Sequence, residues 1–196
     1  EGAFHPGVRE EVEGRGGTYQ PISIVLDSPV AVVTGPNMGG KTVSLATVGL
    51  CVALAQWGIL PPCDRMEFSL YDYVYFQPEA PGKPGLSSFA AEVVALKELL
   101  VRTGDRGLIL LDEVGRGTNP SQGLALYAAV LDYLRRKAGD RSHVMASTHY
   151  HGLASALDVP HWQVAGLTPS GELEESEAGN GKDLDWLYRH MDYRLV

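Results

Sequence analysis

The sequence of 196 residues has few cysteines, no long apolar run and no excess of positive charge. Its two cysteines, Cys51 and Cys63, lack the spacing of metal ligands, so we expect buried or incidental thiols in a reducing compartment. No stretch has the length and apolar character of a membrane span or a signal peptide, which predicts a cytoplasmic protein without a membrane partner.

The charge balance argues against one class of partner. The net charge is −8, whereas a surface that binds nucleic acid by itself needs a basic patch for the phosphates. We therefore expect any contact with DNA to come from regions outside this chain. The first residue is Glu rather than Met, so we also expect a fragment of a longer polypeptide.

What the sequence does contain is a regular alternation of strand and helix patterns. Apolar, β-branched stretches predict strands over 22–26, 30–34, 71–76, 107–113 and 143–147. Helical spacing of apolar residues predicts helices over 42–57, 87–102 and 121–137, with a short one over 184–191, and residues 1–20 read as loop. Residues 161–167 and 172–175 predict a hairpin. The whole predicts one α/β domain over residues 1–196, with a mostly parallel sheet flanked by helices and a small antiparallel part.

The stretch from Gly35 to Thr42 matches the pattern G-x-x-x-x-G-K-[ST] in full, between a predicted strand and a predicted helix. In this arrangement glycine-rich backbone and the helix N-terminus surround the phosphates of a nucleotide. Lys41 can reach the β- and γ-phosphates, and the Thr42 hydroxyl can ligate Mg²⁺. The ATP contacts predicted here are Gly35, Pro36, Asn37, Met38, Gly39, Gly40, Lys41, Thr42 and Val43.

Two carboxylates, Asp112 and Glu113, end the apolar strand that follows about 70 residues later. They should lie at the edge of the sheet beside the phosphate loop. Asp112 can hold Mg²⁺ through water, and Glu113 can polarise the attacking water. The alternative reading is a pair of solvated carboxylates at the end of a strand, which the complete phosphate loop upstream argues against.

His149 ends the next apolar strand, so it should reach the same edge of the sheet, where ligands bind. An imidazole at that position can contact the γ-phosphate and report its presence. We expect His143 and His151 to be surface residues.

Several motifs together resemble the ATPase domain of the MutS family of DNA mismatch-repair and related proteins. They are Thr34–Thr42, Ser87-Ser88-Phe89 with Glu92, Leu111–Thr118, Ser147–Tyr150 and the opening Phe4-His5-Pro6. The resemblance covers roughly residues 4–167. The run Gly-Lys-Thr-Val-Ser-Leu after the loop resembles the branch of the family without mismatch recognition.

This family belongs to the ABC-type P-loop ATPases, so the resemblance implies a dimer with two ATP molecules between the subunits, as a homodimer or with a paralogue. Ser87 and Ser88 resemble the serines that contact the γ-phosphate bound by the opposite subunit. The alternative for both is a helix N-cap. The interface loop is implied to hold Gly115, Arg116, Gly117, Thr118 and Asn119. Asn37 is implied to lie near the γ-phosphate and water, His149 to act as a switch, and Tyr19 to stack on adenine.

The expected function is Mg²⁺-dependent ATP hydrolysis, with Lys41, Asn37, Glu113 and His149 as catalytic residues. Hydrolysis would drive conformational change in DNA repair or recombination. The alternative is an ATP-driven maintenance or reactivation factor that acts on a partner protein without DNA. A scaffold that binds nucleotide without turnover is a third reading, against which the intact Lys41, Asp112 and Glu113 argue.

Overall fold

A computed structural model describes residues 1–36, 38–77, 87–102, 106–138, 142–150, 152–167 and 191–196. Its helices are α1 (Pro6–Gly14), α2 (Lys41–Gln56), α3 (Ser88–Arg102), α4 (Pro120–Ala138) and α5 (Leu153–Leu157). Its strands are β1 (Val30–Thr34), β2 (Tyr73–Phe76), β3 (Gly107–Asp112), β4 (His143–Thr148), β5 (His161–Leu167) and β6 (Met191–Leu195). Within these ranges, no helix is long and apolar enough to cross a membrane.

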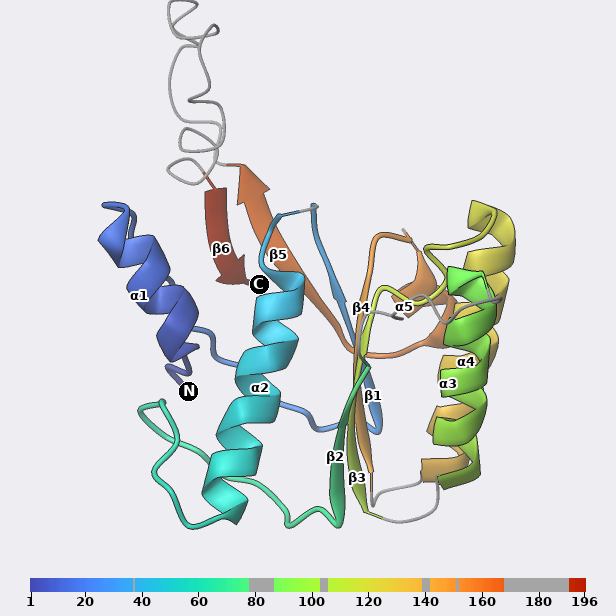
Figure 1. Cartoon of the computed structure of the whole chain (residues 1–196), viewed down its shortest axis with the longest axis horizontal. Coiled ribbons are helices and arrows are strands. Elements are labelled where there is room, and N and C mark those ends of the chain that lie inside the picture. The colour runs from blue at the N-terminus through green and yellow to red at the C-terminus, as the bar shows by residue number, and fades with distance from the viewer. Residues whose placement is uncertain (37, 78–86, 103–105, 139–141, 151, 168–190) are drawn as a thin grey trace, which may run out of the picture.

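The six strands form one sheet in the order β2-β3-β4-β1-β5-β6 (Figure 1). The first five are parallel and β6 is antiparallel to β5, which confirms the predicted α/β fold with a mostly parallel sheet. In the register, Thr34 lies opposite Thr148, and Asp112 lies opposite Ser147. The carboxyl ends of β1, β3 and β4 therefore meet at one edge of the sheet.

Helices cover both faces of this sheet, with α1 and α2 on one side and α3 and α4 on the other (Figure 1). Side chains of a strand point alternately to the two faces. On β3, Leu108 and Leu110 accordingly join the core under α2, and Ile109 and Leu111 join the core under α3 and α4. Because both faces are buried, the central strands are almost wholly apolar, as the sequence predicted.

The N-terminal segment is a helix, which corrects the prediction of a loop over residues 1–20. Helix α1 has Pro at its first position, where the absent N–H costs no hydrogen bond. The His5 ring accepts from the Val8 N–H at 3.4 Å and so caps the helix. Few apolar residues mark this helix in the sequence, so periodicity could not reveal it.

The predicted strand over 22–26 is wrong. Ile22 makes one isolated antiparallel bridge with Ala3, and residues 23–27 carry no assigned strand structure. Pro21 and Pro29 bracket the stretch, and neither has an N–H to donate to a ladder. Ile22 is nevertheless buried in the core under α2.

The C-terminal elements bear out only part of the prediction. Strand β5 is present, and its described antiparallel partner is β6, with Val164 opposite Leu195. The predicted strand over 172–175 and most of the helix over 184–191 lie outside the described residues. Met191, predicted as a helix end, begins β6, so that boundary is wrong.

Candidate functional site

The loop between β1 and α2 depends on its glycines. Gly35 has φ of 149°, and a Cβ there would lie 2.9 Å from the Val164 side chain. Gly40, which caps α2, has φ of 89°, a conformation that suits glycine. A Cβ on Gly39 would lie 2.9 Å from the Pro36 carbonyl oxygen. The loop therefore folds tightly back over the start of α2 and leaves room for a ligand above it.

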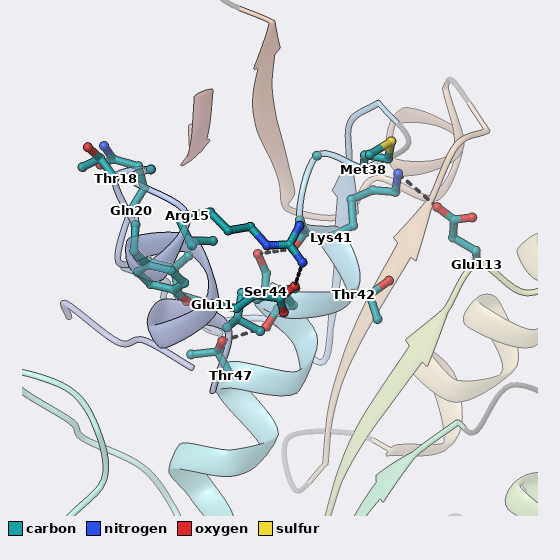
Figure 2. Close-up of a pocket in the computed structure, with 18 of the residues that line it drawn as sticks. Glu11, Arg15, Thr18, Gln20, Met38, Lys41, Thr42, Ser44, Thr47 and Glu113 are labelled. Atoms are coloured by element: carbon teal, nitrogen blue, oxygen red, sulfur yellow. Dashed lines mark hydrogen bonds and ion pairs between the residues drawn. The ribbon is translucent and has the colours of Figure 1, made fainter. Parts of the chain in front are cut away.

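Lys41 is the first residue of α2, and its side chain is only 4% exposed. Its Nζ donates to the main-chain oxygens of Gly35, at 2.9 Å, and Pro36, at 3.0 Å. The same nitrogen lies 3.0 Å from Glu113 Oε1, an ion pair drawn in Figure 2. The ammonium group is thus desolvated and fully surrounded by oxygen acceptors.

Glu113 follows β3 and is 5% exposed, although it is a charged residue. Its φ of 48° is unusual for a residue other than glycine, and the turn is fastened to β4. The Glu113 N–H donates to two oxygens of Ser147, the hydroxyl Oγ at 3.1 Å and the main-chain carbonyl oxygen at 3.2 Å. Backbone contacts therefore hold the carboxylate against the phosphate loop.

The second carboxylate oxygen, Oε2 of Glu113, faces two further groups. Arg116 forms an ion pair with it from the exposed surface. His149 Nδ1 lies 4.0 Å away, and its ring stacks at a tilt on Tyr150. Glu113 is consequently surrounded by Lys41, Arg116 and His149, which lie on three different segments of the chain.

Thr42 and Asp112 bring two oxygen ligands together next to this pair. The Thr42 hydroxyl donates to Asp112 Oδ2 at 2.7 Å, and the Ser147 hydroxyl donates to the other carboxylate oxygen. Hydroxyl and carboxylate oxygens are the ligands that Mg²⁺ prefers, so these residues fit that ion. Among the described residues there is no group of three His, Cys, Asp or Glu that could hold a metal. An ion here would take its remaining ligands from phosphate oxygens and water.

A cavity of about 390 Å³ opens over the phosphate loop (Figure 2). Helix α1 and residues 17–20 form one wall, with Val8 and Val12 as its apolar part. The opposite wall is polar and includes Lys41, Glu113 and Arg116. The α1 wall also carries the ion pair of Arg15 with Glu11, so the cavity offers apolar contacts for a ring system and charged groups for phosphates.

Several residues predicted for nucleotide contact line this cavity. They are Tyr19, Met38, Gly39, Gly40, Lys41, Thr42 and Val43. The Tyr19 hydroxyl accepts from the His5 N–H at 3.0 Å, which ties the wall to the start of α1. Asn37 lies outside the described residues.

The residues predicted for a dimer interface lie on two segments. Ser87 is exposed, and its hydroxyl accepts from the Ala90 N–H at 3.2 Å, so it acts as an N-cap of α3. The side chain of Ser88 is not among those described. Asn119 accepts from the Ser121 N–H at 3.0 Å and caps α4, and Thr118 donates to Gln122 at 3.0 Å. Of the loop, Arg116, Gly117 and Asn119 are exposed.

Sequence reasoning missed some residues of this site. Ser147 hydrogen-bonds both Asp112 and the Glu113 N–H because it lies opposite Asp112 in the register of β3 with β4, a pairing that only the folded sheet shows. The sequence analysis placed Arg116 in the interface loop, and nothing in the sequence indicated its ion pair with Glu113 of the same chain. His143, expected at the surface, is half-buried and hydrogen-bonded to the Tyr71 hydroxyl at 3.0 Å. Burial lowers the pKa of His143.

The chain is similar to known proteins over most of its length. The model of MutS domain V matches residues 31–170. The protein named endonuclease MutS2 from Staphylococcus epidermidis is 39% identical over 151 residues, which are 76% of this chain and 18% of that protein. Proteins of the same name from Staphylococcus haemolyticus and Staphylococcus aureus are 38% identical over 151 residues, 18% and 20% of their lengths. The chain thus spans about a fifth of these relatives, and it belongs to the MutS family through its domain V.

Proposed function

We propose that this chain is a Mg²⁺-dependent ATPase domain of the P-loop, ABC type, within a longer MutS-like protein of the cytoplasm. The observation that carries the proposal is the buried pair of Lys41 and Glu113, 3.0 Å apart beside a nucleotide-sized cavity. A buried ion pair is weak support for stability alone, because desolvation offsets much of the attraction. Its position at the mouth of a phosphate loop favours a catalytic role.

Each side chain has one task in this proposal. Lys41 and the loop amides neutralise charge that develops on the γ-phosphate, and Glu113 orients the attacking water. Thr42 and Asp112 hold Mg²⁺, which supplies charge neutralisation on the phosphate oxygens when bound. His149 and Asn37 complete the surroundings of the γ-phosphate.

Without nucleotide, Lys41 and Glu113 neutralise each other. The γ-phosphate of ATP offers Lys41 a stronger partner with more charge, so ATP binding separates the pair. Glu113 is then free to accept a hydrogen bond from water. The ion pair therefore protects two desolvated charges until the substrate arrives.

A second subunit completes the site in this proposal. Ser87 and Ser88 at the start of α3, with the loop from Gly115 to Asn119, form the face that meets the partner's nucleotide. The exposed position of Ser87, Arg116 and Gly117 supports this arrangement. Closure around two ATP molecules would convert binding energy into movement of attached domains.

Two kinds of molecule on which this movement would act have support, DNA and a partner protein. The relatives named endonuclease MutS2 favour a role in DNA repair or recombination, with DNA bound by regions outside this chain. The net charge of −8 favours the alternative, an ATP-driven maintenance factor that acts on a partner protein.

The test is ATP turnover measured against protein concentration, with and without duplex or branched DNA, on the full-length protein. We expect specific activity to fall on dilution, because each site needs the second subunit. Stimulation by DNA supports the repair role, and turnover indifferent to DNA supports the protein partner. Specific activity that stays constant down to nanomolar protein contradicts the shared site.

A further inference from the structure

The backbone of Gly115, two residues after Glu113, contacts three separate parts of the fold. Its N–H donates to both carboxylate oxygens of Glu92 on α3, each at 3.1 Å. Its carbonyl oxygen accepts from the Tyr150 hydroxyl at 3.3 Å. Its φ is 88°, and a Cβ there would lie 2.7 Å from the Cα of Gly123 on α4. The position of the loop after Glu113 is thus set by α3, α4 and the segment that follows β4.

Glu92 connects this loop to the start of α3. It lies four residues after Ser88, the first residue of α3, which is about one helical turn. The Gln77 side chain donates to Glu92 Oε1 at 3.2 Å, which adds the end of β2 to the same carboxylate. Because a helix moves as a rigid unit, a displacement at Ser87 and Ser88 is carried to Glu92 within one turn.

Glu92 acts without touching the nucleotide cavity, since it is not among the residues that line it. Its charge acts on the same neighbour, Tyr150, as the charge of Glu113 does. Burial raises the pKa of Tyr150, and the charges of Glu92 and Glu113 raise it further. The charges of both carboxylates therefore act on the same tyrosine, which hydrogen-bonds the Gly115 carbonyl oxygen.

We propose that Glu92 is a positioning residue that couples the N-terminus of α3 to Glu113 through the Gly115 N–H. This role rests on the proposed ATPase function and explains how a subunit can respond to its partner. When α3 meets the γ-phosphate held by the other subunit, Glu92 shifts with it and carries the Gly115 peptide along. Glu113 then changes position relative to its own nucleotide. Contact in one site sets the water-orienting carboxylate in the neighbouring site.

The test compares Glu92→Gln with Glu98→Gln, a matched control at an exposed position of the same helix. The glutamine keeps the length of the side chain but removes its charge and one of the two acceptor oxygens. We expect kcat of Glu92→Gln to fall about 10- to 100-fold, the usual effect of losing an orienting contact. KM and ATP affinity should stay close to wild type, and Glu98→Gln should match wild type throughout.

One further readout separates coupling from a general structural role. Hydrogen exchange of residues 113–118 should quicken in Glu92→Gln, whatever the turnover. Unchanged kcat, or a loss of ATP affinity and thermal stability equal to the loss of kcat, overturns the proposal. If wild type shows no turnover, the proposed function fails, while the exchange data still decide whether Glu92 orders the loop.

Discussion

The change Glu113→Gln should weaken the nucleotide-free protein and tighten its binding of ATP. The substitution removes the negative partner of Lys41 but keeps the shape of the side chain. At 3.0 Å and an effective dielectric constant of about 20, two unit charges attract by about 5.5 kcal/mol. Loss of one partner of a buried pair typically costs about 3–5 kcal/mol, because the other charge stays buried.

The lower end of that range applies here. Lys41 keeps two carbonyl acceptors, those of Gly35 and Pro36. We therefore expect the free energy of unfolding to fall by about 3 kcal/mol, which lowers Tm by roughly 6–12 °C in a chain of this size. ATP supplies the missing negative charge, so the variant should bind it about 10- to 100-fold more tightly than wild type does.

The assay measures Tm without nucleotide and the affinity for one non-hydrolysable ATP analogue, in both proteins. Asp132→Asn is the matched control, since Asp132 is an acidic residue whose partners Arg135 and Arg136 are exposed on α4. This control should leave both quantities near the wild-type values. The reasoning is refuted if Glu113→Gln is as stable as wild type and binds the analogue no more tightly.

Three further changes test other parts of the account. Lys41→Ala should abolish measurable ATP affinity by titration, and unchanged affinity would remove Lys41 from its assigned role. Gly115→Ala should destabilise the fold by about 1–3 kcal/mol in denaturant unfolding, because φ is 88° and the added Cβ meets Gly123; unchanged stability would contradict that close packing. Burial lowers the pKa of His143 beside Tyr71, so as the pH falls this histidine is protonated in the unfolded chain before it is protonated in the folded one. Stability should therefore fall as pH drops below about 6.5, and His143→Gln should reduce that dependence; an unchanged slope would contradict it.

The sequence predicted the central part of the fold because each of its signals is local. The strand, glycine loop and helix around Lys41 follow one another within 27 residues, from Val30 to Gln56. Asp112 ends one apolar strand and His149 directly follows the next, and the carboxyl ends of parallel strands share an edge. Spacing along the chain was therefore enough to bring these residues together.

The remainder depends on contacts between distant segments. Helix α1 is polar on most of its surface, so the spacing of apolar residues could not predict it. The stretch from Ile22 to Leu26 has the composition of a strand but finds no ladder partner beyond Ala3. The hydrogen bond of Glu92 with the Gly115 N–H joins α3 to the loop after β3, so it requires the folded positions of both.

The most direct test of the central claim is release of inorganic phosphate from ATP in the presence of Mg²⁺, measured for wild type and Glu113→Gln together. Both proteins are assayed at a concentration high enough for dimers, after ATP binding to each has been verified. The account predicts steady release by wild type and release near background by the variant, which lacks the carboxylate that orients water. Equal rates for the two proteins would contradict it, because the buried carboxylate facing Lys41 would then play no part in hydrolysis.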